Sequence, residues 1–456
     1  MQRVPAQRLT SMLTERLSEY ISSCPEHLVP AEVNAKAALH LVDIMAAMVS
    51  GSRLAAGRKC IPYVANLAGR STCTVVATPL LTTPIDAALA NGMFAHADET
   101  DDSHAPSLTH PGCAVVPAAL AVAEQHGRSG TELLRAVVLG YDIGTRISMA
   151  LGASRFADRY HLSSHAYGGT FGATAAACAL SRLDSNETAN ALSYTVQMVS
   201  GNRCWMRDPE HVQKAFVFGG MPASNGVRAS MLAAAGFTGV SDALQGTPGL
   251  FAAFSEEADA SLATELLGER FEVMRTSIKK WSVGSPIQAA LDAIESIVKD
   301  AGITAKDVAS ISVTLPLQRA RVADSAMPNV NLRHVLALYL NDAGVTFASL
   351  HDPARMHDSS VQQIANRINV APRAGAARHE QAELTLVTTD GRTFERAPEH
   401  VRGQPANPMT ADEVVDKARS LIAPVLGDSN GDALLEKLLQ PESIENVLTL
   451  REFLHA

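Results

Sequence analysis

A long series of helical patterns fills the sequence between Val33 and Phe254 and limits the folds open to it. Apolar residues in this stretch recur at three- and four-residue spacing, as on the buried face of an amphipathic helix, and no alternating strand pattern interrupts them. Alanine-rich runs such as Ala173–Ala179 favour helices that approach one another closely, because alanine is the best helix former and has a small side chain. Six or more helices in succession predict an all-helical domain.

The pattern changes after about residue 270, where strand signals begin. Residues Ser310–Leu317 alternate in polarity and are rich in β-branched side chains, as a half-buried strand should be. Asp390-Gly391 separates two more alternating runs, which is typical of a β-hairpin. A chain of 456 residues also exceeds what one compact core usually holds. We therefore predict a mainly α protein with a large helical domain, residues 1–270 and 405–456, and a smaller α+β lid domain, residues 271–404.

The charge and the cysteines exclude several classes of protein. A formal net charge of −9 argues against nucleic acid as a partner, because phosphate binding needs a basic surface, but a few converging lysines could still bind a small anion. Six cysteines without a C-x-x-C pair give neither a disulfide framework nor a zinc motif. We find no signal-peptide pattern and no apolar run of the roughly 18 residues that a membrane helix needs. These features predict a cytoplasmic protein without membrane contacts.

The segment from His96 to His110 is the most unusual in the chain, because four carboxylates and three histidines fall within fifteen residues. Acid–base groups with perturbed pKa values gather at functional sites, so this segment is a candidate active site. Histidine and carboxylate side chains also bind zinc, manganese or iron, which makes a metal site the competing interpretation. The segment lacks the H-E-x-x-H spacing of a metalloprotease, and a solvated loop is the structural alternative.

A second candidate segment places His161 and His165 before the glycine-rich start of an alanine-rich helix, Gly168–Gly172. The amides at a helix N-terminus favour anions, so a histidine at this point suits an acidic substrate. The alternative is that the glycines serve helix packing. Two lysines also stand out, although most lysines are solvated: Lys214 leads an apolar helix, and Lys279 lies near the predicted domain junction.

Taken together and in this order, these motifs resemble the MmgE/PrpD family, which includes 2-methylcitrate dehydratase, cis-aconitate decarboxylase and iminodisuccinate epimerase. The resemblance runs from about Asp43 to the end of the helical region and continues more faintly through the smaller domain. It implies a helical domain with an α+β lid, a homodimer, and a reaction without a metal or other cofactor. The motifs that carry the resemblance are Asn91–His96, Asp101-Asp102-Ser103, His110-Pro111-Gly112, Gly168–Ala173, Asn225–Ala229 and Gly236–Gly239.

Matched residue by residue, the resemblance implies roles for individual side chains. Glu99 and Ser103 stand where the family has aspartate and threonine, and the proline and cysteine that follow the family's second lysine are absent after Lys279. The histidine ahead of the glycine-rich helix is matched to His161 by its Arg-Tyr-His context, although the glycine spacing also suits His165. The implied catalytic residues are His110, His161, Lys214 and Lys279, and the implied substrate-binding residues are Glu99, Ser103, His165, His334 and Lys280, with no metal ligand.

These roles predict a metal-independent lyase or isomerase that moves a proton next to a carboxylate of a small anionic (poly)carboxylic acid. The lysines would hold the developing negative charge, and the histidines would exchange the proton, since imidazole titrates near neutral pH. Dehydration, decarboxylation and epimerisation can all proceed from this arrangement, so the sequence leaves them open. Two alternatives remain: a metal-dependent lyase or hydrolase that uses the His96–His110 cluster, and a catalytically silent carboxylate-binding paralogue, which the altered pocket positions suggest.

Overall fold

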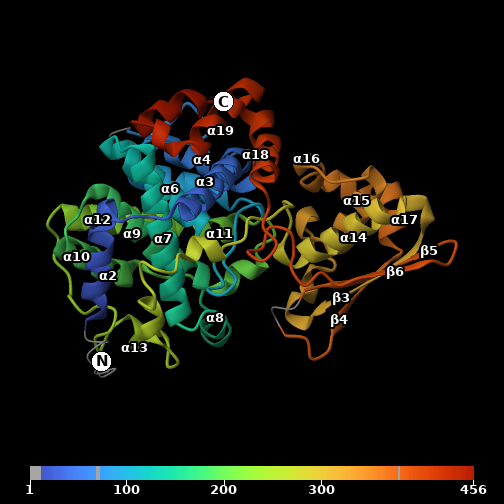
Figure 1. Ribbon diagram of the computed structural model, residues 1–456, viewed down its shortest axis with the longest axis horizontal. Helices are drawn as coiled ribbons and strands as arrows, with labels where there is room; N and C mark the ends of the chain where they lie inside the picture. The colour runs from blue at the N-terminus through green and yellow to red at the C-terminus, as the bar shows by residue number, and fades with distance from the viewer. Residues whose placement is uncertain (1–11, 68–71, 378–380) are drawn as a thin grey trace. The chain divides into compact units, whose positions relative to one another are not determined.

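The computed structural model of the chain describes residues 12–67, 72–377 and 381–456, and it confirms the predicted fold class, mainly α with a smaller α+β part. The described residues form two compact units. One holds the residues up to Ile278 together with Thr410–Ala456, and the other holds Lys279–Met409. We call them the helical unit and the α+β unit, and Figure 1 shows the elements of each.

Helices α7 (Gly130–Ala150) and α9 (Ser164–Ser181) pack against each other in the helical unit and are buried along most of their length. Their backbones approach so closely that a Cβ atom built on Gly144 would lie 2.4 Å from the carbonyl oxygen of Gly168. Only glycine fits at such a contact. The glycine-rich start of α9 therefore serves helix packing, the structural alternative that the sequence raised.

The other helices of the helical unit pack on this pair or on one another. Helix α6 contacts both α7 and α9, α12 lies against α9, and α5 joins α6 to α12. Helices α18 and α19 follow the α+β unit in the sequence, yet both lie against α3 (Figure 1). The bounds of these helices are α2 Leu13–Ser22, α3 Ala31–Gly51, α4 Ala55–Ala65, α5 Pro84–Ala95, α6 Gly112–His126, α8 Ser154–Tyr160, α10 Ser185–Met198, α11 Val212–Ala215, α12 Met221–Ala234, α13 Leu250–Phe254, α18 Ala411–Leu426 and α19 Asp428–Leu439.

Two features of the helical unit depart from an all-helical domain. Strands β1 (Cys73–Thr74) and β2 (Leu81–Thr82) form a short antiparallel pair. Between α11 and α12 the backbone makes a π-helical turn over Phe216–Gly220, where the sequence predicted one continuous helix. Such turns between α-helical segments are frequent at functional sites, which draws attention to this part of the fold.

Helix α3 is long and apolar enough to cross a membrane by length and composition, although the sequence predicted no such segment. In the structure, 78% of its apolar window is buried inside the protein. Helices α5, α7 and α18 all contact α3, so its apolar side chains form part of the core of the helical unit.

The α+β unit is built on a four-stranded sheet with the strand order β4-β3-β5-β6. Strand β3 (Val308–Pro316) runs parallel to β4 (Ile368–Arg373) and antiparallel to β5 (Glu383–Thr388). Strand β5 then forms the predicted hairpin with β6 (Thr393–Arg396). The mixed sheet thus combines one local hairpin with two pairings between segments far apart in the sequence, one parallel and one antiparallel.

Helices α14 (Gln288–Ala301), α15 (Leu332–Asp342) and α17 (Ser359–Ala365) lie on one face of this sheet (Figure 1). Alternate strand residues such as Ile311 and Leu384 are buried in the core that the sheet forms with the helices. This alternation is the period-two pattern from which the strands were predicted. A further short helix, α16, spans Phe347–Leu350.

Candidate active site in the helical unit

Three histidine side chains gather around the ring of Phe218 in the helical unit, and a fourth adjoins one of them. His96 and His165 stack on this ring, with ring centroids 4.4 and 3.8 Å from that of Phe218, and the His110 centroid lies 5.7 Å away. His211 adjoins His96, and their ring centroids are 5.2 Å apart. We call these four residues the histidine cluster.

The histidine cluster is assembled from separate points of the fold. His96 directly follows α5, His110 precedes α6, His165 lies in the first turn of α9, and His211 directly precedes α11. The π-helical turn that carries Phe218 follows α11. The ends of four helices therefore converge on one cluster of side chains, which explains why no single local motif reveals the whole site.

The carboxylate of Asp101 joins two members of the cluster. Asp101 is fully buried, and it accepts a hydrogen bond from Nδ1 of His96 at 2.8 Å. Its other oxygen lies 3.3 Å from Nδ1 of His110. A carboxylate beside Nδ1 fixes the orientation of an imidazole and leaves Nε2 to face another group. Asp101 can therefore orient both rings and stabilise an imidazolium that forms at His110.

Burial keeps three members of the histidine cluster neutral. It lowers the pKa of His96 to about 3 and outweighs the Asp101 carboxylate, which raises it. Burial also lowers the pKa of His165 well below its ordinary value, and the neighbouring His110 adds to this effect. The pKa of His211 is lowered as well, first by burial and then by the charge of a nearby lysine. Near neutral pH these three imidazoles are uncharged and can accept a proton or a hydrogen bond.

That lysine belongs to an ion pair beside the cluster. The ammonium of Lys214 contacts Oε1 of Glu99, and Nε2 of His211 lies 3.1 Å from the same oxygen. Nζ of Lys214 also lies 5.5 Å from the ring centroid of Trp205 and 5.0 Å from that of Phe218. The lysine therefore brings a positive charge next to neutral imidazoles, in surroundings where little water screens it.

Four of the residues predicted from the sequence lie together in this region: Glu99, His110, His165 and Lys214. His161 does not join them. It is exposed at the C-terminal end of α8, in a left-handed conformation with φ 55°, and its carbonyl accepts a hydrogen bond from a backbone amide. The glycine spacing therefore points to the histidine in the cluster, His165, whereas the Arg-Tyr-His context points to the exposed His161.

Three predicted residues belong to the α+β unit. Lys279 is buried at its first position, with 4% of its surface exposed. Lys280 pairs with Glu295, and its Nζ lies 4.3 Å from the ring centroid of Trp281. His334 is buried in the first turn of α15, and burial lowers its pKa. Their roles in catalysis and binding stay predictions from the resemblance.

A second buried carboxylate, Asp102, supports the segment that carries His110. It accepts hydrogen bonds from Nδ1 of His40 at 2.8 Å, from the hydroxyl of Tyr141, and from the amide of Gly112 at 3.1 Å. Asp102 thereby ties α3 and α7 to the first residue of α6, close to His110. The Asp-Asp dipeptide was part of the resemblance, but the separate tasks of its two carboxylates are visible only in the structure.

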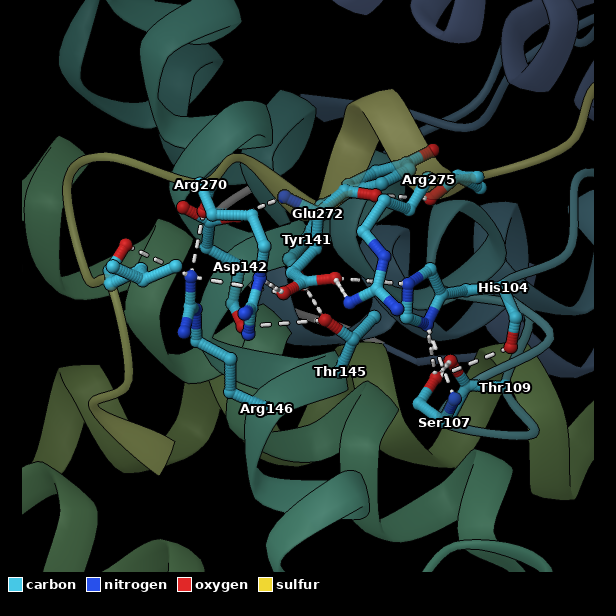
Figure 2. Close-up of polar contacts among 12 residues, drawn as sticks. His104, Ser107, Thr109, Tyr141, Asp142, Thr145, Arg146, Arg270, Glu272 and Arg275 are labelled. Carbon is cyan, nitrogen blue, oxygen red and sulfur yellow. Dashed lines mark hydrogen bonds and ion pairs between the residues drawn. The ribbon is translucent and has the colours of Figure 1, made fainter. Parts of the chain in front are cut away.

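A separate ionic network, shown in Figure 2, surrounds the carboxylate of Glu272. Arg270 and Arg275 each donate to it at 2.9 Å, Nε2 of His104 lies 3.2 Å away, and a guanidinium nitrogen of Arg146 lies 3.7 Å away. Burial raises the pKa of Glu272, but the hydrogen bonds from His104 and Arg270 outweigh it and hold the value at about 2. His104 belongs to this network and not to the histidine cluster.

The segment that follows Glu272 leads out of the helical unit at Ile278. Ser103, predicted to bind substrate, pairs with Ser277 of this segment through two backbone hydrogen bonds of 3.0 and 2.8 Å. The Glu272 network and this bridge together hold the segment 272–278, the last part of the helical unit before the α+β unit begins, against the loop between His96 and His110.

Two groups of described residues bring three possible metal ligands within 4.8 Å of one another. One consists of His96, Glu99 and His211, and the other of His96, Asp101 and Cys113; all of these side chains are buried. Neutral imidazole and carboxylate are ligands that suit zinc and related ions. The side chains of both groups therefore fit a metal site, the competing interpretation of the His96–His110 segment.

Comparison with known families finds matches in both units. The profile of the MmgE/PrpD N-terminal domain matches residues 15–263, and the profile of the MmgE/PrpD C-terminal domain matches residues 281–440. The first match alone covers more than half of the chain. The second match begins at residue 281, close to the boundary between the two units.

Three individual relatives carry related names. The cis-aconitate decarboxylase-like protein oryM of Aspergillus oryzae is 22% identical, over 96% of each chain. The human cis-aconitate decarboxylase is 23% identical over 81% of this chain and 79% of its own length. A cis-aconitate decarboxylase of Aspergillus terreus is 25% identical over 53% of this chain and 49% of its own length.

Proposed function

Since the chain belongs to the MmgE/PrpD family, we propose that it is a lyase or isomerase that acts on a small carboxylic acid by proton transfer next to a carboxylate. The relatives named above include enzymes that decarboxylate cis-aconitate, which supports a lyase acting on an acid of this class. At 22–25% identity the substrate and the exact reaction belong to the proposal.

The observation that carries the proposal is the juxtaposition of acid–base groups and one cation. His110 and His165 lie with their ring centroids 5.2 Å apart, and Lys214 faces the same phenylalanine ring as both. Proton transfer to or from carbon needs a group that exchanges a proton and a charge that holds the product anion. This part of the helical unit offers both.

In the proposed mechanism the proton leaves a carbon next to a carboxylate, and the electron pair moves into that carboxylate. This enolate-like state is too costly without a nearby cation, and Lys214 supplies one by turning from Glu99 to the substrate. His110 accepts the proton, while Asp101 orients the ring and stabilises the imidazolium. His165 takes the role that the resemblance assigned to His161. It exchanges the other proton of the reaction, which goes to the leaving hydroxide or to carbon.

The fate of the enolate-like state distinguishes the three reactions of the family. After proton removal, loss of hydroxide assisted by a proton gives dehydration, and return of a proton to the opposite face gives epimerisation. In decarboxylation no proton is removed first: the C–C bond to the departing carbon dioxide breaks, its electron pair forms the carbanion, and a histidine delivers a proton to that carbon. All three use the same groups. Glu99 and Ser103 replace the aspartate and threonine of the family, which favours a substrate that differs from methylcitrate and cis-aconitate.

The experiment that tests the proposal is a substrate screen followed by proton NMR. The panel holds tricarboxylates, hydroxydicarboxylates and unsaturated acids, each incubated with the full chain. We expect conversion of at least one acid, and its product identifies the reaction. A folded protein that is thermally stabilised by an acid of the panel but converts none of them would contradict the enzyme and favour the silent carboxylate-binding paralogue.

A further inference from the structure

His96 has the surroundings of a metal ligand. Its side chain is fully buried, and its Nδ1 donates a hydrogen bond to Asp101 at 2.8 Å. Its Nε2 has no hydrogen-bond partner among the described residues. Histidines that bind metals usually donate one ring nitrogen to a carboxylate in this manner, which fixes the tautomer and leaves the lone pair of the other nitrogen for the ion.

Glu99 and His211 complete a possible set of three ligands. One ligand atom from each of His96, Glu99 and His211 lies within 4.8 Å of the others, and Nε2 of His211 is 3.1 Å from Oε1 of Glu99. Two ligands bound to one zinc ion at about 2.0–2.2 Å and near-tetrahedral angles are roughly 3.4 Å apart. The three side chains therefore need only small movements to meet at one ion, with a fourth position left for water.

The other possible group, His96 with Asp101 and Cys113, is less suited to an ion. Asp101 already accepts a hydrogen bond from His96 and lies 3.3 Å from His110. An ion bound there would have to break the contacts that orient both rings. In the group with Glu99 and His211, Asp101 keeps these contacts and holds His96 through its Nδ1.

We propose that His96, Glu99 and His211 form a binding site for Zn²⁺, and that the ion inhibits the enzyme by displacing Lys214 from Glu99. The claim that zinc binds depends on these three side chains alone, whereas the claim that zinc inhibits rests on the proposed function. A divalent ion and the Lys214 ammonium compete for one carboxylate oxygen. Imidazole ligands select zinc and its neighbours over Mg²⁺ and Ca²⁺.

The binding test titrates Zn²⁺ into the chelator-treated full chain by calorimetry. We expect one ion per chain, and at least about tenfold weaker binding in His211→Asn and in Glu99→Gln. Lys214→Met removes the competing cation, so zinc should bind about tenfold more tightly. His161→Asn, an exposed histidine outside the set, is the matched control and should bind zinc as the parent protein does. Circular dichroism of each variant verifies that it is folded.

Several outcomes would overturn the proposal. If zinc binding does not saturate, or if folded His211→Asn binds zinc as tightly as the parent protein does, the proposed site is wrong. If Lys214→Met binds zinc more weakly than the parent protein, zinc does not displace Lys214 from Glu99. Cobalt gives an independent readout, because a thiolate charge-transfer band would assign the ion to the group with Cys113. The calorimetry needs no substrate, so its result is independent of whether the proposed function is correct.

The inhibition is tested once a substrate is found. The chelator-treated enzyme should be active, and micromolar zinc should inhibit it. Activity that zinc at saturating concentration leaves unchanged would refute the inhibition.

Discussion

At the level of single residues, His161 and His165 are four positions apart but lie in different surroundings: one is exposed at the end of α8, and the other stacks on Phe218 beside His110. We expect His165→Asn to lower kcat by about 10²–10⁴-fold, the usual contribution of positioned proton transfer. His161→Asn should cost less than about threefold, because asparagine tolerates the left-handed conformation found there. Steady-state kinetics of both variants decides, and a reversed order would return the acid–base role to His161.

Lys214 gives a second test at this scale. Lys214→Met keeps most of the side-chain volume but removes the charge, so turnover should fall by at least about 100-fold while the protein stays folded. Lys59→Met is the matched control, since Lys59 forms an exposed pair with Glu210. Near-normal turnover in Lys214→Met would show that Lys214 merely neutralises Glu99.

The sequence indicated some of these residues and missed others for a physical reason. Glu99 and His110 stand in one short segment whose charge density is visible without a structure. His211 lies 112 residues from its partner Glu99, in a stretch with no unusual composition, so only the tertiary fold brings it to the site. Phe218, the ring at the centre of the histidine cluster, is one apolar residue among many in a predicted helix.

At the level of elements, the segment after Glu272 depends on a buried carboxylate whose pKa is depressed to about 2. A depressed pKa adds stability above the unfolded value near 4.5, and this stability is lost as the pH falls towards 2. The Tm difference between the parent protein and Glu272→Gln should therefore be large at pH 7 and should narrow as the pH falls through about 4.5. Glu265→Gln, at a half-exposed partner of Arg270, serves as the control. A Tm difference independent of pH would contradict the ionised state of Glu272.

Elements were predictable where one segment carries its own signal. The hairpin of β5 and β6 follows from Asp390-Gly391 between alternating runs. Strand β4 pairs in parallel with β3 across a long connection, so the pairing itself leaves no local signal in the sequence. The two-residue strands β1 and β2 are too short to show an alternation. The π-helical turn before α12 has the helical spacing of its neighbours, which concealed it.

At the level of the whole molecule, the resemblance implies a homodimer, and we keep that expectation as a proposal. Multi-angle light scattering of the full chain at micromolar concentration should give about twice the mass of 48.2 kDa. Unchanged mass on tenfold dilution would support a stable dimer. A monomeric mass under these conditions would contradict it.

The most direct test of the central claim is solvent exchange at carbon. With the best acid of the panel in deuterium oxide, proton NMR should show deuterium entering the carbon next to a carboxylate, in substrate or product, at a rate that His110→Asn lowers by at least about 100-fold. Exchange is visible even where net conversion is small. For a dehydratase the reaction is run from the unsaturated acid, because addition of deuterium oxide places solvent deuterium on carbon. Decarboxylation, epimerisation or hydration without solvent deuterium on any carbon, or exchange that is unaffected in folded His110→Asn, would contradict the proposed proton transfer.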